Sequence, residues 1–248
     1  MEFDHIKALV LAAGKGTRLR TEGIDLPKVL RTACGTPLLG WVLAALDFLP
    51  RESTILVIGY EREKVRAAFP DYPFAVQETL NGTGGAVQYA APLLNDPDGH
   101  VLVCCGDVPL MGRETYLSLL RTHLTSGSDC TLLSARLEEG GSYGRILRDT
   151  SGAFLRIVEA RDCTPAQAAV TEVNTGTYVF RVSALLAVLD RLSDSNAQGE
   201  LYLTDVPALI LARGGRVSLC DTCAPEEMLG VNTPEQLRQV EALLAARG

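Results

Sequence analysis

Short apolar runs alternate with amphipathic stretches through the first half of the chain, and this alternation constrains the fold more than any other feature. Residues 6–11 form an apolar run bounded by charge and by glycine, which is typical of a short buried strand. Comparable runs lie at residues 53–58, 74–77, 101–105 and 131–137, and helical stretches at residues 36–49, 61–68, 83–94 and 113–126 separate them. Strands that alternate with helices predict βαβ units. We therefore expect an α/β fold with a mixed, mostly parallel sheet flanked by helices.

The pattern changes in the second half of the chain. Residues 143–149 and 154–159 flank Ser151 and Gly152, a pair typical of a hairpin turn. We interpret residues 138–181, with 173–181 as the returning strand, as an antiparallel insertion that forms a lid over the sheet edge. Helices at residues 182–192, 203–212 and 233–247 and a strand at residues 217–220 follow. We expect residues 1–248 to form a single domain that contains this inserted subdomain.

The loop after the first strand carries glycine and an excess of positive charge. Gly14 and Gly16 stand at the strand's carboxyl end, where open α/β sheets place their ligands. Glycine lets backbone N–H groups approach a phosphate closely. Two acidic residues, Glu22 and Asp25, lie here among five cationic ones, which are Lys15, Arg18, Arg20, Lys28 and Arg31. The loop suits a polyphosphate, although a tight strand-to-helix turn would explain the two glycines as well.

The spacing of this loop excludes two common phosphate-binding motifs. A Walker A loop has four residues between its glycines and then Gly-Lys-Ser or Gly-Lys-Thr. The dinucleotide fingerprint has a third glycine where Leu19 stands. A second glycine-rich segment, residues 80–86, also follows a strand, so two turns at one sheet edge can hold a nucleotide from both sides. A flexible loop with Thr83 as the N-cap of the next helix is the simpler alternative.

Composition limits the classes of partner. A net charge of −7 argues against nucleic acid, so a cationic loop in an acidic protein points to a small anionic ligand. No stretch is long enough to span a membrane, and the first residues do not resemble a signal peptide, so we expect a cytoplasmic protein. The seven cysteines are expected to be reduced thiols. Cys220 and Cys223 lack the second ligand pair that a zinc site needs.

An ordered series of motifs narrows the family. The chain has Leu-x-x-Gly-x-Gly-Thr-Arg from Leu11 to Arg18, followed by Pro27-Lys28, a pattern that resembles the sugar-1-phosphate nucleotidyltransferases. Later motifs occur in order at residues 82–84, 106–110, 143–146, 157–159, 174–176, 196–205 and 230–232. Together they resemble the uridylyltransferase domain of bacterial N-acetylglucosamine-1-phosphate uridylyltransferases, over roughly residues 6 to 240. The resemblance implies a Rossmann-like nucleotide-diphospho-sugar transferase fold.

The resemblance also implies roles for individual residues. Arg18 and Lys28 would be catalytic and hold phosphates, and Asp107 and Asn232 would bind Mg²⁺. The implied nucleotide contacts are Leu11, Ala12, Gly14, Gly16, Thr17, Gln77, Gly82 and Thr83. The implied sugar contacts are Gly144, Glu159, Asn174 and Thr204. The substrates would be UTP and the sugar-1-phosphate, with no nucleic acid or membrane partner, and the oligomeric state is left open.

The chemistry of these residue types supports the implied roles. Mg²⁺ prefers hard oxygen ligands and keeps several waters, so one carboxylate, one amide oxygen and substrate phosphates suffice. The sugar phosphate would attack the α-phosphorus of UTP and expel pyrophosphate. A phosphate is already a nucleophile near neutral pH, so the protein needs to supply alignment and positive charge. Taken singly, Asp107 is also explained as a turn residue, Asn232 as a helix N-cap and Glu159 as an exposed strand residue.

The sequence departs from the family pattern at three positions. Leu80 stands where glutamine is common, Gly85 where histidine is common, and Cys105 where an aromatic residue is common. These departures leave open a different nucleotide or a different sugar-1-phosphate, and a non-catalytic nucleotide-sugar sensor is a further alternative. The chain contains no hexapeptide repeats, so we expect neither a left-handed β-helix nor acetyltransferase activity.

Overall fold

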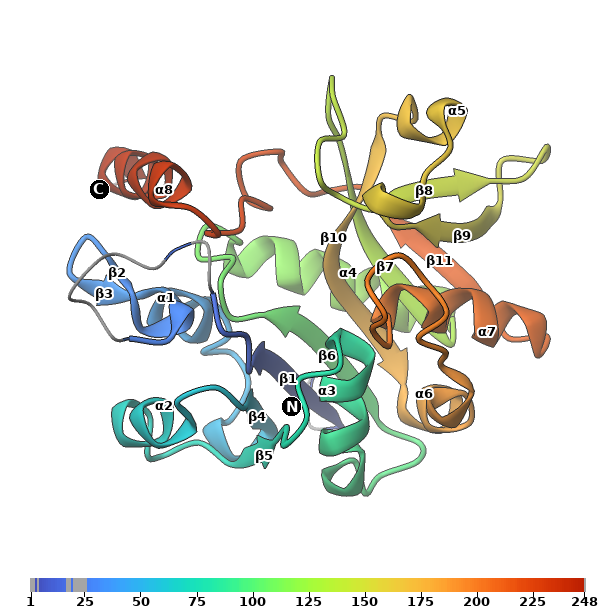
Figure 1. Ribbon diagram of the computed structural model, residues 1–248. Helices are drawn as coiled ribbons and strands as arrows, with labels where there is room; N and C mark the ends of the chain where they lie inside the picture. The colour runs from blue at the N-terminus through green and yellow to red at the C-terminus, as the bar shows by residue number, and fades with distance from the viewer. Residues whose placement is uncertain (1–2, 4, 17–18, 20–25, 248) are drawn as a thin grey trace.

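A computed structural model describes residue 3, residues 5–16, residue 19 and residues 26–247. Nine strands of this described chain form one mixed sheet, flanked by helices (Figure 1). Seven of them lie in the order β11-β7-β10-β6-β1-β4-β5, and β8 and β9 extend from β10. The strands are β1 (Ile6–Ala12), β4 (Thr54–Ile58), β5 (Phe74–Val76), β6 (His100–Cys105), β7 (Cys130–Arg136), β8 (Arg145–Arg148), β9 (Phe154–Val158), β10 (Glu172–Arg181) and β11 (Val217–Cys220). The expected mixed, mostly parallel α/β sheet is confirmed.

Strand β1 lies at the centre of the parallel part of the sheet. It pairs in parallel with β4 on one side and with β6 on the other, and β5 continues beyond β4. The chain therefore reverses its direction of travel across the sheet between β5 and β6, which makes the carboxyl ends of β1 and β6 a topological switch point. Ligands of open α/β sheets bind at such a point.

The side chains of β1 alternate between two hydrophobic cores. Ala8 and Val10 belong to the core covered by α1 (Leu38–Ala45), α2 (Arg62–Ala68) and α4 (Arg113–Ser126). Leu9 belongs to the core covered by α3 (Thr83–Ala90), α6 (Val182–Leu186) and α7 (Val206–Ala212). Because successive side chains of a strand point to opposite faces, an uninterrupted apolar run is what a sheet covered on both faces requires.

Two expected helices differ from the structure near proline. The helix expected from residue 36 begins at Leu38, because Thr36–Pro37 (β3) pairs with Thr32–Ala33 (β2) across a tight turn. In that turn Cys34 and Gly35 have φ angles of 51° and 79°. The helix expected over residues 83–94 ends as α3 at Ala90, and a 3₁₀ turn with Pro92 near its start follows at Ala91–Leu93.

The returning strand of the expected lid belongs instead to the central sheet. β10 lies between β6 and β7 and is antiparallel to both. Nearly all of its residues are buried, including polar ones such as Asn174 and Thr175, as a strand inside the sheet requires. The inserted part that extends beyond the seven central strands is the β8–β9 hairpin, in which Arg145 of β8 pairs with Val173 in the first half of β10. The assignment of residues 173–181 to a lid was therefore wrong.

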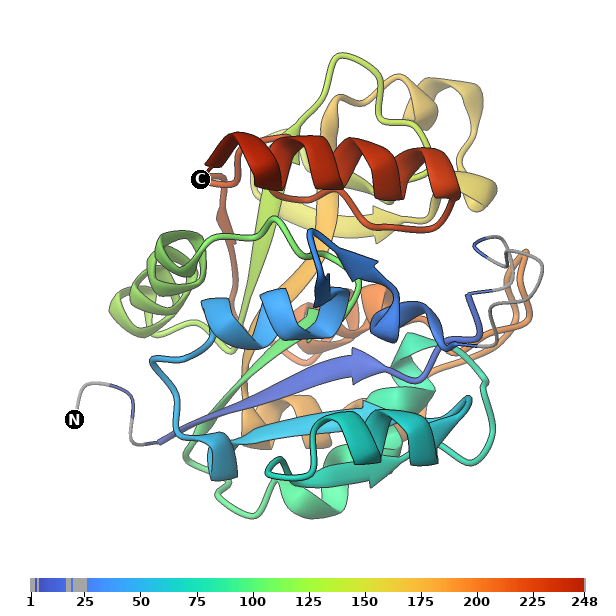
Figure 2. The same ribbon diagram turned by 90° about the vertical axis from the view of Figure 1, so that its left-hand side faces the viewer.

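The C-terminal helix packs beside the loop that follows β1. In Figure 2, α8 (Pro234–Arg247) lies over the β2–β3 hairpin and α1. Leu19, Leu38 and Val240 share a small third core with Val231. This packing joins α8 to the side of the fold that carries the loop after β1. In the described part of the chain, no helix combines the length and the apolar character that a bilayer-crossing segment needs.

All seven cysteines lie in described residues and are free thiols, as expected. Cys104, Cys130, Cys220 and Cys223 are buried. Burial raises the pKa of the Cys223 thiol to about 12, because the thiolate would lose its hydration. Cys220 and Cys223 both belong to the hydrophobic core that α1, α2 and α4 cover, so the pair contributes to packing.

A buried histidine pair predicts how stability depends on pH. His123 on α4 contacts His100 (Nε2 to Nδ1, 3.0 Å) and Thr131 (Nδ1 to Oγ1, 2.9 Å). Burial, and then the charges of His100 and Arg181, lower the pKa of His123 from 6.5 to about 3. The unfolded chain therefore binds an extra proton between these pH values, and stability is lost as pH falls through this window.

We expect the free energy of unfolding to fall by up to about 1.4 kcal/mol per pH unit below pH 6.5 because of His123. Urea unfolding at pH 7.5 and at pH 5 measures the change. The His123→Gln variant has no titrating group at this position and should show a shallower slope over the same range. Equal slopes for the two proteins would contradict the assignment.

Candidate active site

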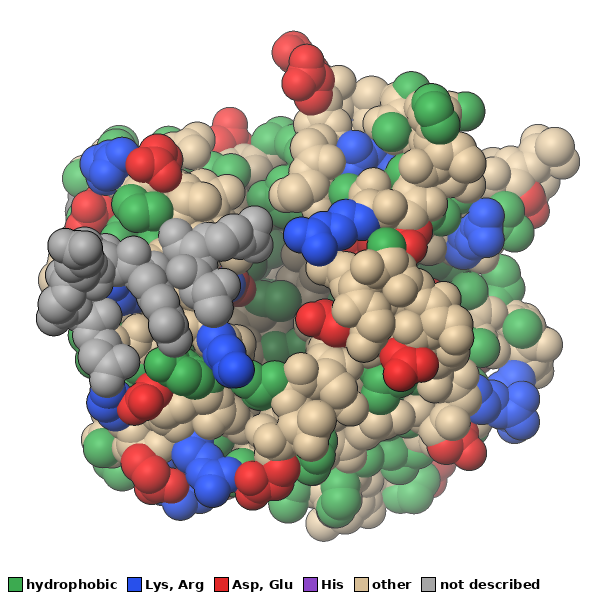
Figure 3. Space-filling view, in the orientation of Figure 1, with side chains coloured by type: hydrophobic (Ala, Val, Ile, Leu, Met, Phe, Trp, Pro, Cys, Tyr) green, Lys and Arg blue, Asp and Glu red, His purple; other side chains and the backbone are tan. Residues whose placement is uncertain are grey.

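A cavity of about 480 Å³ opens at the carboxyl ends of β1 and β6. Figure 3 shows a hollow near the middle of this face, with hydrophobic side chains in its depth and Lys or Arg side chains at its rim. Nine of the predicted site residues line the cavity, which are Leu11, Ala12, Gly14, Gly16, Lys28, Gln77, Gly82, Thr83 and Asp107. Thr17 and Arg18 lie outside the residues that the structure describes. The two glycine-rich loops therefore face one cavity.

Lys28 joins the predicted metal ligands. Its ammonium group forms an ion pair with Asp107 Oδ2 and donates to Asn232 Oδ1 over 3.0 Å. The side chains of Lys28 and Asp107 are only 14% and 16% exposed. Three segments far apart in the sequence thus meet here: the 3₁₀ turn Lys28–Leu30, the end of β6 and the start of α8.

Backbone contacts hold Asn232 beside Asp107. The Val231 N–H donates to the Asp107 carbonyl over 2.9 Å. This hydrogen bond holds the backbones of the two segments together beside the side chains of Asp107 and Asn232. The alternative role of Asn232 as a helix cap is taken by its neighbour. Thr233 Oγ1 accepts from the Gln236 N–H (3.3 Å), and Gln236 Oε1 accepts from the Thr233 N–H (3.1 Å), which is a capping box. The Asn232 side chain is left to contact Lys28, which lines the cavity.

The residues present fit a hard divalent cation. The ammonium of Lys28 already shows that Asp107 and Asn232 can hold one positive charge between their oxygens. One carboxylate and one amide oxygen suit Mg²⁺ when waters and phosphates complete its coordination. Within the described ranges, no group of three or more His, Cys, Asp and Glu residues could hold a metal. A metal ion here would therefore depend on oxygens that the substrate brings.

The second glycine-rich loop is held by the segment around Leu201. The Gly84 N–H donates to the Leu201 carbonyl and the Leu201 N–H to the Asn81 carbonyl, both over 2.8 Å. Thr83 is the first residue of α3 and accepts from the Leu203 N–H over 3.2 Å, whereas Gly82 holds the N-cap position. The interpretation of Thr83 as an N-cap was therefore wrong.

The predicted sugar residues form a second cluster on the β8–β10 side. The Asn174 N–H donates to the Gly144 carbonyl (2.9 Å), and Thr204 donates to Glu159 (2.9 Å). A Cβ atom on Gly144 would lie 3.6 Å from both carboxylate oxygens of Glu159. All four residues are thus brought together. Burial raises the pKa of Glu159, and the hydrogen bond from Thr204 opposes this rise.

The cluster around Glu159 and the cavity at β1 and β6 are neighbours. Cys105 lines the cavity at β1 and β6, and its Sγ lies 4.0 Å from the carbonyl oxygen of Gly176. The Gly176 N–H in turn donates to Asn174 Oδ1 over 3.2 Å. A short chain of contacts therefore connects the place expected for the nucleotide with the place expected for the sugar.

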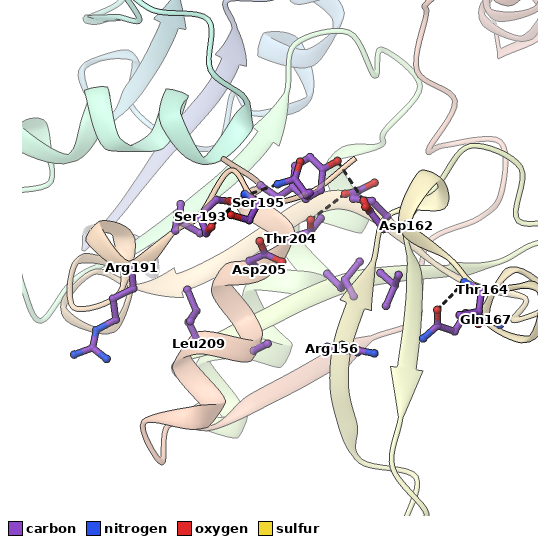
Figure 4. Close-up of a pocket in the computed structure, with 17 residues that line it drawn as sticks. Arg156, Asp162, Thr164, Gln167, Arg191, Ser193, Ser195, Thr204, Asp205 and Leu209 are labelled. Atoms are coloured by element: carbon purple, nitrogen blue, oxygen red, sulfur yellow. Dashed lines mark hydrogen bonds between the residues drawn. The ribbon is translucent and has the colours of Figure 1, made fainter. Parts of the chain in front are cut away.

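A further cavity of about 660 Å³ adjoins Glu159 and Thr204. In Figure 4, Arg156 projects from β9 and Arg191 from a 3₁₀ turn on the opposite side, with Thr204 and Asp205 between them. Tyr202 lines this cavity, and its hydroxyl donates to Asp162 over 3.3 Å. The cavity lacks the glycine loops and Lys28, so the cavity at β1 and β6 is the better candidate for phosphate chemistry.

Some cavity residues received no role from the sequence. Leu80, Cys105 and Glu200 line the cavity at β1 and β6. Leu80 and Cys105 were visible as departures from the family pattern, and Glu200 belongs to the motif at residues 196–205. No signal in the sequence showed that this motif would contact the loop at residues 80–84, because the contact depends on tertiary packing.

The family follows from comparison with known proteins. The sequence pattern of the MobA-like NTP transferase domain matches residues 8–205 of the chain. The chain belongs to this family. As an NTP transferase domain it carries the nucleotidyltransferase fold and chemistry class that the motif series indicated.

Curated relatives of this NTP transferase are proteins named bifunctional protein GlmU. The Synechococcus sp. strain CC9605 protein is 43% identical over 241 residues, which are 96% of this chain and 52% of that protein. The Pelobacter propionicus protein is 38% identical over 248 residues, which are 99% of this chain and 53% of that protein. The chain spans about half the length of these relatives. The resemblance inferred from the motif series is confirmed.

A solved structure confirms the fold of the NTP transferase. It is that of a Bacillus anthracis protein crystallised with sucrose, which carries the provisional name glucose-1-phosphate thymidylyltransferase. The TM-score is 0.73 at 18% sequence identity, and the match covers 96% of this chain and 94% of that one. At this identity the likeness shows a shared architecture.

Gly82 should be required for the stability of the second glycine-rich loop. Gly82 has a φ of 105°, and a Cβ atom there would lie 2.5 Å from the Leu201 carbonyl oxygen. We expect Gly82→Ala to lower the free energy of unfolding by about 1–3 kcal/mol in urea. Gly14→Ala is the matched control, because a Cβ there meets nothing within 4 Å. Equal stability of the two variants would contradict this account of the loop.

Proposed function

We propose that this NTP transferase moves a uridylyl group from UTP to N-acetylglucosamine-1-phosphate, giving UDP-N-acetylglucosamine and pyrophosphate with Mg²⁺ as cofactor. The observation that carries the proposal is the position of Lys28 between Asp107 and Asn232 inside the cavity formed by the two glycine-rich loops. Positive charge at that point suits a reaction between two phosphate groups. The similarity to GlmU proteins over almost the whole chain supports the choice of substrates.

The residues of the chain would act by alignment and by charge neutralisation. Mg²⁺ held by Asp107 and Asn232 would neutralise phosphate oxygens as negative charge develops during the displacement. Lys28 would then hold a phosphate oxygen, with Arg18 as its expected partner. The backbone N–H groups near Gly14 and Gly16 would face the triphosphate. The attacking oxygen belongs to the sugar phosphate, so no side chain has to take up a proton.

The cluster at Glu159 would hold the sugar. A carboxylate accepts hydrogen bonds from sugar hydroxyls, and Thr204 already orients one oxygen of Glu159. Gly144 leaves the space next to the carboxylate free, since a Cβ there would lie 3.6 Å from both carboxylate oxygens of Glu159. We place N-acetylglucosamine-1-phosphate between this cluster and Lys28, with its phosphate towards the ammonium group.

Removing Glu159 should weaken sugar binding selectively. We expect Glu159→Ala to raise the KM for the sugar phosphate about tenfold or more, with a KM for UTP close to that of the wild type. Initial rates of pyrophosphate release measure both constants. Asp162→Asn is the matched control, because Asp162 lines the neighbouring cavity and contacts Tyr202. A parallel rise in both KM values would contradict a sugar-specific role for Glu159.

A substrate matrix tests the proposed function as a whole. The purified protein is incubated with Mg²⁺ and each combination of five nucleoside triphosphates with N-acetylglucosamine-1-phosphate, glucose-1-phosphate and mannose-1-phosphate. Pyrophosphate release should be fastest for UTP with N-acetylglucosamine-1-phosphate. A faster reaction with another pair would replace the substrates named here. Binding of UDP-N-acetylglucosamine without any turnover would favour the sensor.

A further inference from the structure

The carboxamide of Gln77 is held at the wall of the nucleotide cavity with one end fixed. Gln77 follows β5, is only 5% exposed and lines the cavity. Its Nε2 donates to Asn81 Oδ1 over 3.2 Å and to the Gly82 carbonyl over 3.0 Å. A carboxamide nitrogen carries two N–H groups, so both are used. None of the described residues donates to Oε1, which leaves the carbonyl oxygen for a ligand.

Asn81 reaches Gln77 because the helix opposite it has no side chain at one position. The Asn81 carboxamide lies against the bare Cα of Gly85 in the first turn of α3. A Cβ on Gly85 would overlap Asn81 Oδ1 and would lie 2.6 Å from Asn81 Cγ. The backbone of Asn81 is held separately, since its N–H donates to the Thr79 carbonyl and its carbonyl accepts from Leu201. The position of the carboxamide can therefore change while the loop stays in place.

We propose that Asn81 is a positioning residue that sets the base preference of the nucleotide site by holding Gln77 with its carbonyl oxygen towards the base. The inference rests on the proposed function, because it assumes that a nucleotide base enters this cavity. A carbonyl oxygen accepts a hydrogen bond from the N3–H group of uracil. Cytosine has an acceptor lone pair at N3, so the same orientation repels it. Turning the carboxamide round would place Oε1 against two acceptors, Asn81 Oδ1 and the Gly82 carbonyl.

Three variants separate this role from a structural one. Asn81→Leu removes one of the two acceptors that hold Gln77. Gly85→Ala adds a methyl group that displaces the Asn81 carboxamide, while the backbone contacts of the loop remain. Asn81→Asp keeps an oxygen acceptor at the same place. Its added charge repels every nucleoside triphosphate alike and leaves the preference between bases unchanged.

The readout is the ratio of kcat/KM for UTP to kcat/KM for CTP, measured with N-acetylglucosamine-1-phosphate, with thermal melting as the check on folding. We expect the wild type and Asn81→Asp to share one ratio in favour of UTP. We expect the ratio to fall about two- to tenfold in both Asn81→Leu and Gly85→Ala, the range of one lost hydrogen bond.

The outcomes distinguish this inference from the proposed function. An unchanged ratio in a folded Asn81→Leu variant would overturn the inference and leave the proposed function in place. A ratio that falls as far in Asn81→Asp as in Asn81→Leu would overturn it as well. A wild-type protein that transfers no nucleotidyl group to any sugar phosphate would overturn both.

Discussion

Replacing Lys28 by methionine should lower kcat/KM for nucleotidyl transfer by about a hundredfold or more. The ammonium group is nearly buried and contacts both Asp107 and Asn232. In the proposed reaction it also holds a phosphate oxygen, and each hydrogen bond to a charged group is worth about 1.5–3 kcal/mol. Methionine keeps the length of the side chain and removes the charge. Initial rates with UTP and N-acetylglucosamine-1-phosphate measure the loss.

Lys15 provides a control of the same residue type. It lines the same cavity but is exposed to solvent, so its charge is screened. We expect Lys15→Met to lower kcat/KM by no more than about threefold. An equal loss in the two variants would show that the general positive charge of the cavity matters and that the placement of Lys28 does not.

Replacing Asp107 by asparagine should abolish most of the activity and weaken metal binding. Asp107 is the carboxylate at the end of β6, and Lys28 and Asn232 meet beside it. Without its charge, the proposed site would hold Mg²⁺ through neutral oxygens alone. We expect kcat to fall about a hundred- to a thousandfold, as for the loss of one preorganised electrostatic contact to the transition state. Pyrophosphate release gives the rate, and electron paramagnetic resonance of Mn²⁺ gives the binding.

Glu200 is the matched control for Asp107. It is another carboxylate that lines the cavity, and its backbone N–H and carbonyl contact Asn196. Glu200→Gln should leave Mn²⁺ binding unchanged and alter kcat by about twofold or less. Tight Mn²⁺ binding and a normal rate in Asp107→Asn would contradict the assignment of the metal ligands.

The sequence predicted the parallel part of the fold well because local signals there agree with packing. The runs that became β1 and β6 are apolar on both faces, and α4 was predicted with its observed ends. The error at β10 has a different origin. β10 follows the β8–β9 hairpin in sequence, but most of its pairing is with β6 and β7. Pairing partners so distant in sequence are not encoded in the strand itself.

The sequence predicted which residues form the candidate site, but it did not predict how their side chains contact one another. From the motif series we expected Lys28, Asp107 and Asn232 to belong to one site. The structure places the Lys28 ammonium in contact with both of the other side chains. The bridging position of the Lys28 ammonium between the two oxygens did not follow from the sequence. The same holds for Asn81, whose side chain contacts Gln77 only because Gly85 leaves room for it. Such contacts depend on side-chain directions that only the folded chain defines.

The fate of labelled phosphorus tests the central claim most directly, that this cavity joins two phosphate groups by displacement at the α-phosphorus of UTP. The protein is incubated with Mg²⁺, N-acetylglucosamine-1-phosphate and UTP that is labelled either at the α- or at the γ-phosphorus. We predict that the α label appears in UDP-N-acetylglucosamine and the γ label in pyrophosphate. Release of the γ label as inorganic phosphate, or an α label that never reaches a sugar nucleotide, would contradict the account.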